Sequence, residues 1–342
     1  MSGTGVVFDE RFRAHAAPYE HPESPARLAA IESRLEARGL LARCPRVPAR
    51  EATDSEILAV HDQSLLEVVE GAASRPFSQL DPDTYANSQS PLAARLAAGG
   101  LIDLTLEVLA GRLDSGVALL RPPGHHAERA QAMGFCLYNN VAIAAAAALS
   151  GAASRVLIVD WDLHHGNGTQ DIFWNEPAVV YFSTHQAPLY PGTGGLDETG
   201  GPEAPGHTVN VPWPPGRGDA DHLAAFDRLL LPIARKFSPD LVLVSAGFDA
   251  ARGDLLGSQL VSPGGYGAMT ARLTELAGGR VVLALEGGYE LDAISASAEA
   301  CLRVLLGDLA PAPEPGPASA IATHVIDAAV AQHRAFWPGL KG

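Results

Sequence analysis

The sequence of 342 residues is poor in positive charge and almost free of lysine. Acidic residues outnumber basic ones by 39 to 24, which gives a formal net charge of −15, and Lys236 and Lys341 are the only lysines. A surface with this balance repels phosphate backbones, so we expect no nucleic-acid partner.

Cysteine and long apolar runs are scarce as well. Cys44, Cys136 and Cys301 are odd in number, widely spaced and outside any CxxC motif, which argues against a disulfide framework or a thiolate zinc site and indicates a reducing compartment. The longest apolar run, 141–149, is mostly alanine and much shorter than the roughly 18 residues of a membrane span. The first residues lack the apolar segment of a signal peptide. We therefore expect a soluble, cytoplasmic protein with no membrane partner.

The sequence does contain enough apolar material for a large core, with 47% hydrophobic and 18% charged residues. Its length allows two domains, but we see no repeat and no change of composition along the chain, so we expect one domain over 1–342. The proline-rich stretch 310–317 predicts an extended connector, followed by a final helix at about 321–336.

Short β-branched runs, with helical stretches between most of them, predict a largely parallel sheet. The longer runs, such as RVLIVD and RVVLALEGG, show no alternation of apolar and polar residues, which is typical of strands buried on both faces. We therefore predict a single-domain, three-layer α/β/α fold. The expected strands are 6–8, 117–120, 156–159, 179–182, 241–244 and 281–285.

In a parallel sheet, ligands bind beyond the carboxyl ends of the strands, and the residues found there are unusual. They are the residue types of a metallohydrolase: His125 and His126, then Asp160, Asp162, His164 and His165, then Ser183, Asp249 and Tyr289.

Asp160, Asp162 and His164 are spaced by two along a segment that we expect to be extended, so their side chains face one side. Two carboxylates and one imidazole can hold Zn²⁺ or Fe²⁺ with a coordination position left open. This set requires that one carboxylate comes from elsewhere, for which Asp249 is a candidate, and that one of the three residues has a different role.

The adjacent imidazoles of His125 and His126 suit acid–base chemistry near neutral pH, because one can stay neutral while the other is held cationic. Tyr289 follows Gly287 and Gly288, where the backbone can turn tightly. Its hydroxyl is well suited to donate a hydrogen bond to an oxyanion.

Around these residues the chain resembles the zinc-dependent histone deacetylase and acetylpolyamine amidohydrolase family, which has an arginase-like α/β fold. The motifs follow the order of the family along nearly the whole chain, and their wording is most similar to the class II branch and its bacterial relatives. They are HPESPARL, RPPGHHA, GFCLYNN, DWDLHHGNGTQ, YPGTG, LVSAGFDAARGD and LEGGY.

The resemblance implies one catalytic Zn²⁺ and a structural K⁺. The zinc ligands would be Asp162, His164 and Asp249. The potassium site would involve Asp160, Asp162, His164, Ser183 and Thr184. The substrate tunnel would be lined by Pro123, Gly134, Phe135, Tyr190 and Leu256.

The implied reaction is hydrolysis of an acetyl or other acyl amide on the lysine side chain of a peptide or protein. The metal and Tyr289 would polarise the carbonyl, and His126 would move the proton from water to the leaving amine. His125, backed by Asp160, would give electrostatic support, and His165 would be structural. Asn167 stands where some members have aspartate, so His126 would lack an anionic partner and be less basic.

Other functions remain open from the sequence. Acetylpolyamines or other small acetylated amines are one alternative: Leu256 at the position of an acidic gatekeeper argues against it, whereas Asp81 and Asp83 near the rim favour it. Arginase chemistry would need carboxylates at positions where the HHA and LEGGY segments have His and Tyr, which argues against it. A binding module that holds acyl-lysine without turnover would have no need for both His126 and Tyr289. The resemblance also admits a homo-oligomer.

Overall fold

The computed structural model describes residues 3–308 and 316–340, and its centre is a parallel sheet of seven strands. The strand order is β1-β4-β9-β8-β5-β6-β7, and every neighbouring pair is parallel. The strands are β1 (Thr4–Val7), β4 (Ser115–Ala118), β5 (Val156–Asp160), β6 (Val179–Gln186), β7 (Thr208–Trp213), β8 (Leu241–Ala246) and β9 (Val281–Leu285). The single three-layer α/β domain predicted from the sequence is confirmed.

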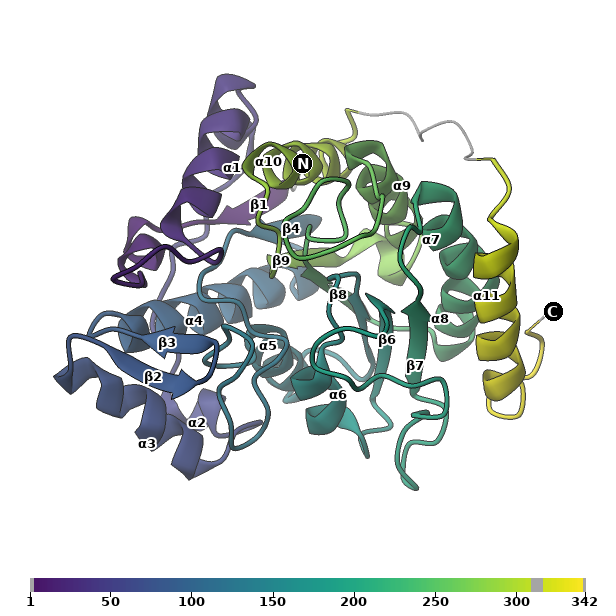
Figure 1. The fold of residues 1–342 in the computed structure, drawn as a ribbon, viewed down its shortest axis with the longest axis horizontal. Helices are drawn as coiled ribbons and strands as arrows, with labels where there is room; N and C mark the ends of the chain where they lie inside the picture. The colour runs from purple at the N-terminus through teal and green to yellow at the C-terminus, as the bar shows by residue number, and fades with distance from the viewer. Residues whose placement is uncertain (1–2, 309–315, 341–342) are drawn as a thin grey trace.

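Helices cover both faces of this sheet (Figure 1). One face carries α4 (Ser90–Leu109), α5 (Asn140–Leu149) and α6 (Asn167–Phe173), whereas α1 (Pro25–Ala37), α9 (Pro263–Leu273) and α10 (Leu291–Leu305) lie on the other. The remaining helices are α2 (Asp54–Ile57), α3 (Gln63–Gly71), α7 (Asp219–Ala225), α8 (Leu231–Phe237) and α11 (Ala320–His333). Five short helical turns also lie within the described residues: η1 (Glu10–Ala14), η2 (Leu41–Arg43), η3 (Ala72–Ser74), η4 (Phe226–Leu230) and η5 (Ala277–Gly279).

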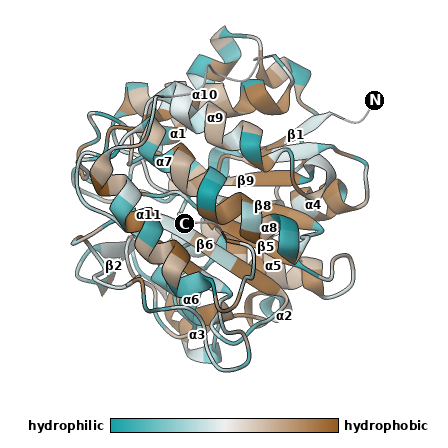
Figure 2. Cartoon of the chain, turned by 90° about the vertical axis from the view of Figure 1, so that its right-hand side faces the viewer, coloured by the Kyte–Doolittle hydropathy of each residue, from teal (hydrophilic) through white to brown (hydrophobic). Residues whose placement is uncertain are grey.

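The central strands are apolar along their whole length because both of their faces are covered. Every residue of β5, β8 and β9 is buried, and Figure 2 shows these strands as hydrophobic bands inside the more hydrophilic helices. Among the described residues, no helix has the length and apolar character that crossing a membrane requires.

Three strands are not among those predicted from the sequence. β7 contains Asn210 and Pro212, and its place at the edge of the sheet explains how it tolerates a proline, which cannot donate to a neighbouring strand. β2 (Ser78–Asp81) and β3 (Thr84–Ala86) form a short, partly polar antiparallel hairpin outside the main sheet.

The observed helix ends agree with the start and stop signals in the sequence better than the strands agree with theirs. α1 begins at Pro25, and Gly39 follows it with a φ of 67°, in the left-handed region that favours glycine. The final helix, expected at about 321–336, is α11 (Ala320–His333). Most of the predicted connector 310–317 lies outside the described residues.

Candidate active site

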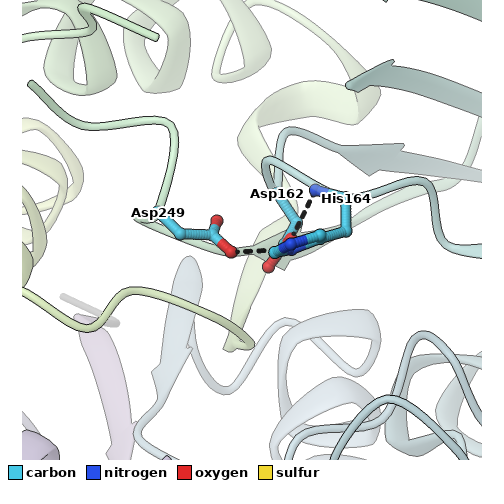
Figure 3. A group of neighbouring side chains, drawn as sticks. All are labelled: Asp162, His164 and Asp249. Carbon is cyan, nitrogen blue, oxygen red and sulfur yellow. Dashed lines mark hydrogen bonds and ion pairs between the residues drawn. The ribbon is translucent and has the colours of Figure 1, made fainter. Parts of the chain in front are cut away.

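Three potential metal ligands meet beyond the carboxyl ends of β5 and β8. Asp162 and His164 follow β5, and Asp249 follows β8 (Figure 3). Their ligand atoms all lie within 4.8 Å of one another, and His164 Nδ1 is 3.2 Å from Asp162 Oδ1 and 3.1 Å from Asp249 Oδ2. The segment between Asp160 and His164 is a series of bends, so our expectation of an extended segment was wrong.

Backbone N–H groups aim the two carboxylates. Leu163 N donates to Asp249 Oδ1 at 2.8 Å, which leaves Oδ2 toward His164. Gly287 N donates to Asp162 Oδ2 at 2.9 Å, and Oδ1 turns to His164. A side chain at Gly287 would collide with both carboxylates, so this position needs glycine.

The three residues fit a divalent cation. Asp162 and Asp249 are at most 1% exposed, and two buried carboxylates this close repel each other unless a positive charge lies between them. Burial and the charge of Asp162 raise the pKa of Asp249 to about 7. Oxygen and nitrogen ligands of this kind suit Zn²⁺ and also Fe²⁺.

The two adjacent histidines have different partners. His125 Nδ1 lies 3.0 Å from the buried carboxylate of Asp160, whereas His126 Nδ1 lies 2.8 Å from Asn167 Oδ1. Burial alone would lower the pKa of His125, but Asp162 and Asp160 outweigh it and raise that pKa to about 10. Burial and the positive charges of His125 and His164 hold the pKa of His126 well below its usual value. These surroundings favour the cationic form of His125 and the neutral form of His126.

Glu286 fixes the loop that carries these histidines, although the sequence analysis gave it no role. Its Oε2 accepts hydrogen bonds from the backbone N of Gly124 at 2.6 Å and of His125 at 3.2 Å. Its Oε1 accepts from the hydroxyl of Ser245 at 3.2 Å. Glu286 belongs to the LEGGY motif, which was therefore an available signal.

A buried cluster of charged residues supports the loop that carries Tyr289. Arg27 donates to the carbonyl oxygens of Glu286 and of Gly288, the latter at 2.6 Å, and its guanidinium lies 5.1 Å from the centre of the Tyr289 ring. Glu23 pairs with Arg27 at 3.0 Å and with Arg121 at 2.5 Å, and all three side chains are fully buried. These residues stand in the HPESPARL and RPPGHHA motifs, but nothing in the sequence indicates that they meet.

The predicted tunnel residues surround one cavity of 180 Å³. Phe135 and Tyr190 supply aromatic walls, and the more buried His126 and Tyr289 belong to the same lining. Asp83 also lines it, and its carboxylate accepts a hydrogen bond from Gly134 N at 3.2 Å. The structure places all five predicted residues here: Pro123, Gly134, Phe135, Tyr190 and Leu256. Their contact with substrate stays a prediction.

Of the residues predicted to hold potassium, Asp160, Ser183 and Thr184 lie on neighbouring strands, whereas Asp162 and His164 follow β5. Ser183 and Thr184 belong to β6, which continues to Gln186 instead of ending at Phe182 as expected. Ser183 lies opposite Asp160 in the pairing of β6 with β5, and its hydroxyl is 2.9 Å from His185 Nδ1. The side chain of Thr184 is buried, and its hydroxyl has no hydrogen-bond partner among the described residues.

His165 makes polar contacts through both ring nitrogens. Nδ1 is 2.7 Å from the hydroxyl of Thr193, and Nε2 is 3.0 Å from Gln170 Oε1. These contacts fit the structural role that the sequence analysis gave it.

Comparisons with known proteins agree with this geometry. The family model described as "Histone deacetylase domain" matches residues 21–305. The protein named Histone deacetylase 15 from Arabidopsis thaliana is 49% identical over 316 residues, which cover 90% of this chain and 57% of that protein. Histone deacetylase HDA1 from Candida albicans is 41% identical over 340 residues, covering 89% of this chain and 41% of that protein.

The chain thus spans about half the length of the curated relatives it matches. Among solved structures, the "HDA15 HD domain" superposes with a TM-score of 0.95 at 47% identity. It covers 99% of this chain and 98% of that one.

Proposed function

Because the chain belongs to the histone deacetylase family, we propose that it removes acetyl or other acyl groups from lysine side chains of peptides or proteins. One observation carries the proposal: His164 of the three-ligand cluster lines the same cavity as His126 and Tyr289. The whole region 1–342 would act as one deacetylase domain.

The family is generally zinc-dependent, and we propose that Asp162, His164 and Asp249 hold one Zn²⁺ here. The metal would supply a Lewis acid that polarises the amide carbonyl and activates water. K⁺ is proposed at Asp160, Asp162, His164, Ser183 and Thr184, supported by the pairing of Asp160 with Ser183 across β5 and β6.

The chain's own residues would then complete the reaction. The neutral imidazole of His126 accepts a proton from the attacking water and later gives one to the leaving amine. The Tyr289 hydroxyl donates to the developing oxyanion. His125, held cationic by Asp160 and Asp162, stabilises the same negative charge, and the walls of Phe135 and Tyr190 enclose the methylene chain of the lysine.

A small acetylated amine is a second candidate, and Asp83 is the observation that favours it. Its carboxylate lines the cavity and offers a partner for a cationic substrate such as an acetylpolyamine. Leu256, which also lines the cavity, favours a neutral stem.

Steady-state kinetics on the zinc-loaded protein tests the proposal. Acetyl-, trifluoroacetyl- and longer acyl-lysine peptides are compared with acetylputrescine and acetylspermidine, with a hydroxamate-inhibited control. We expect hydroxamate-sensitive turnover of the lysine peptides. Higher kcat/KM for polyamines would favour the second candidate. Metal binding without any turnover would favour a module that only binds acyl-lysine.

A cytoplasmic location, the absence of nucleic-acid partners and a homo-oligomeric state remain predictions. The location is supported by the three cysteines, which are all free and buried, as in proteins from a reducing compartment.

A further inference from the structure

One glutamate, Glu128, lies behind the proposed base and is separated from it by a single amide group. His126 Nδ1 is 2.8 Å from Asn167 Oδ1, and Asn167 Nδ2 donates to Glu128 Oε1 at 2.7 Å. Imidazole, amide and carboxylate therefore form one chain of hydrogen bonds that leads away from the cavity. The resemblance implies no anionic partner for His126, and none contacts it directly at Asn167, but the carboxylate of Glu128 lies on the far side of the Asn167 amide.

We infer that Glu128 is a positioning residue: its carboxylate fixes which end of the Asn167 amide faces His126, and thereby which ring nitrogen of His126 can accept a proton. This inference rests on the proposed function for its catalytic meaning. A carboxylate only accepts hydrogen bonds, so only the NH₂ end of Asn167 can face Glu128. The amide oxygen then faces His126 and requires a proton on Nδ1, which leaves Nε2 bare as the acceptor.

The amide needs such a partner because its two ends have nearly the same shape. If it turned over, the NH₂ group would face Nδ1, and the ring proton would have to move to Nε2, which would no longer accept. The wrong tautomer of a catalytic histidine costs up to about 10⁴ in kcat in serine proteases. Besides Glu128, the NH₂ group has the sulfur of Met133 at 3.4 Å, a weak acceptor.

The backbone of Glu128 is itself well held. Its N–H donates to the carbonyl of Gln131 at 3.0 Å, and its carbonyl oxygen lies 2.9 Å from His61 Nδ1. The side chain is half-buried and lines a second cavity, of 320 Å³, that also contains Asp171. The carboxylate is therefore presented to Asn167 from a fixed loop.

The comparison with His125 explains why an amide is useful at this position. His125 contacts the carboxylate of Asp160 directly, and a carboxylate in direct contact favours the cationic imidazole. Asn167 transmits the orientation set by Glu128 without bringing a full charge to the ring. This arrangement suits a histidine that must be neutral before it accepts a proton.

The first test is the kinetics of Glu128→Gln in the zinc-loaded protein. The new side chain can present either end of its own amide, so it no longer selects one orientation of Asn167. We expect kcat to fall about 10- to 100-fold, within the contribution of a general base, while KM changes less than about twofold. The control is Asp171→Asn, which removes the same charge from the same cavity and should leave kcat unchanged. An unchanged kcat in Glu128→Gln would overturn the inference.

The second test is a rescue that a purely structural contact would not give. In the double variant Glu128→Gln/Asn167→Asp, the new carboxylate at position 167 can only accept hydrogen bonds. It would accept one from His126 and one from the new amide at position 128. We expect kcat to rise above that of Glu128→Gln because the tautomer is selected again, and to stay below that of the starting protein because a full charge now lies beside His126. The single variant Asn167→Asp should be slower than the double, because it places two carboxylates against each other. A double variant no faster than Glu128→Gln would refute the role of Glu128.

Nitrogen NMR of ¹⁵N-histidine-labelled protein separates this inference from the proposed function. His126→Gln identifies the signals of His126, which should show the Nδ1–H tautomer in the unsubstituted protein and a mixture in Glu128→Gln. An identical tautomer in both proteins would overturn the inference. Absence of turnover on every acylated substrate, together with the expected tautomer change, would instead contradict the proposed function alone.

Discussion

The two sides of the cavity are built in different ways. Asp162, His164 and Asp249 directly follow two neighbouring strands, and backbone N–H groups aim their carboxylates. The opposite side, with the two histidines and Tyr289, sits on loops held by buried charged side chains from distant parts of the chain. Arg27 in α1 bonds the carbonyl of Gly288, 261 residues away.

The ligand side and the loop side therefore have different physical requirements. The ligand side needs the ends of β5 and β8, the backbone N–H of Gly287 after β9, and glycines that leave room for the carboxylates. The loop side depends on Glu23, whose carboxylate pairs with both Arg27 and Arg121 in a site without water contact. Substitutions should therefore affect metal binding on one side, and folding stability on the other.

The largest effect is expected from Asp249→Asn, which keeps the acceptor for Leu163 N but removes a charge from the ligand side. Metal affinity should fall more than about 100-fold, because loss of a residue that only supports a ligand already costs 10- to 100-fold. Turnover should fall with it. Metal content after dialysis, measured by mass spectrometry, checks this, with the exposed Asp62→Asn as control. Full zinc content in Asp249→Asn would contradict the proposed ligand set.

Glu23→Gln addresses the loop side. It leaves two buried guanidinium groups without their anion, and breaking a buried pair typically costs about 3–5 kcal/mol of unfolding free energy. The matched control is Glu275→Gln, because the Arg235–Glu275 pair is exposed and should be worth less than about 1 kcal/mol. Urea unfolding of both variants measures the difference. Equal losses would show that the buried cluster does not support the fold more than a surface pair.

Tyr289→Phe separates chemistry from support within the loop side. It keeps the ring that lies against Arg27 and removes only the hydroxyl. We expect kcat to fall roughly 10²-fold, as for the loss of one oxyanion donor, with unchanged zinc content and thermal midpoint. A normal kcat would refute the proposed role of Tyr289.

The same comparison explains what could be predicted from the sequence. The parallel sheet and the convergence of Asp162 and Asp249 follow from apolar runs and from the rule that strands of one direction end at one edge. The pairing of Glu23 with Arg121 leaves no periodic signal, because it depends on how two distant loops pack. The resemblance identified Asn167, but the role of Glu128 follows only from the orientation of the Asn167 amide in the structure. The edge strand β7 was missed because its proline and asparagine resemble a loop.

The smallest expected effect is the acid sensitivity of the loop side, which His15 should reveal. His15 Nε2 lies 3.6 Å from Glu23 Oε2 in the buried cluster, and its ring stacks on Tyr85. Burial lowers the pKa of His15 to about 3 despite the attraction of Glu23. Burial would raise the pKa of Glu23, but Arg121 and Arg27 outweigh it and hold that pKa well below its usual value.

The lowered pKa values of His15 and Glu23 make the protein less stable in the same direction, as the pH falls. The unfolded chain binds a proton on His15 below about pH 6.5 and on Glu23 below about pH 4.5, whereas the folded protein does not until lower pH. The contribution of these two residues to stability should therefore be complete above pH 6.5 and fall toward pH 3, by up to about 1.4 kcal/mol per pH unit for each proton. Other buried histidines, such as His61 and His222, with pKa values lowered to about 4, add to the total slope. His15→Asn should therefore reduce the slope of unfolding free energy against pH, between pH 6 and 4, by about 1.4 kcal/mol per pH unit, which corresponds to one proton. An unchanged slope would show that His15 does not couple the cluster to pH.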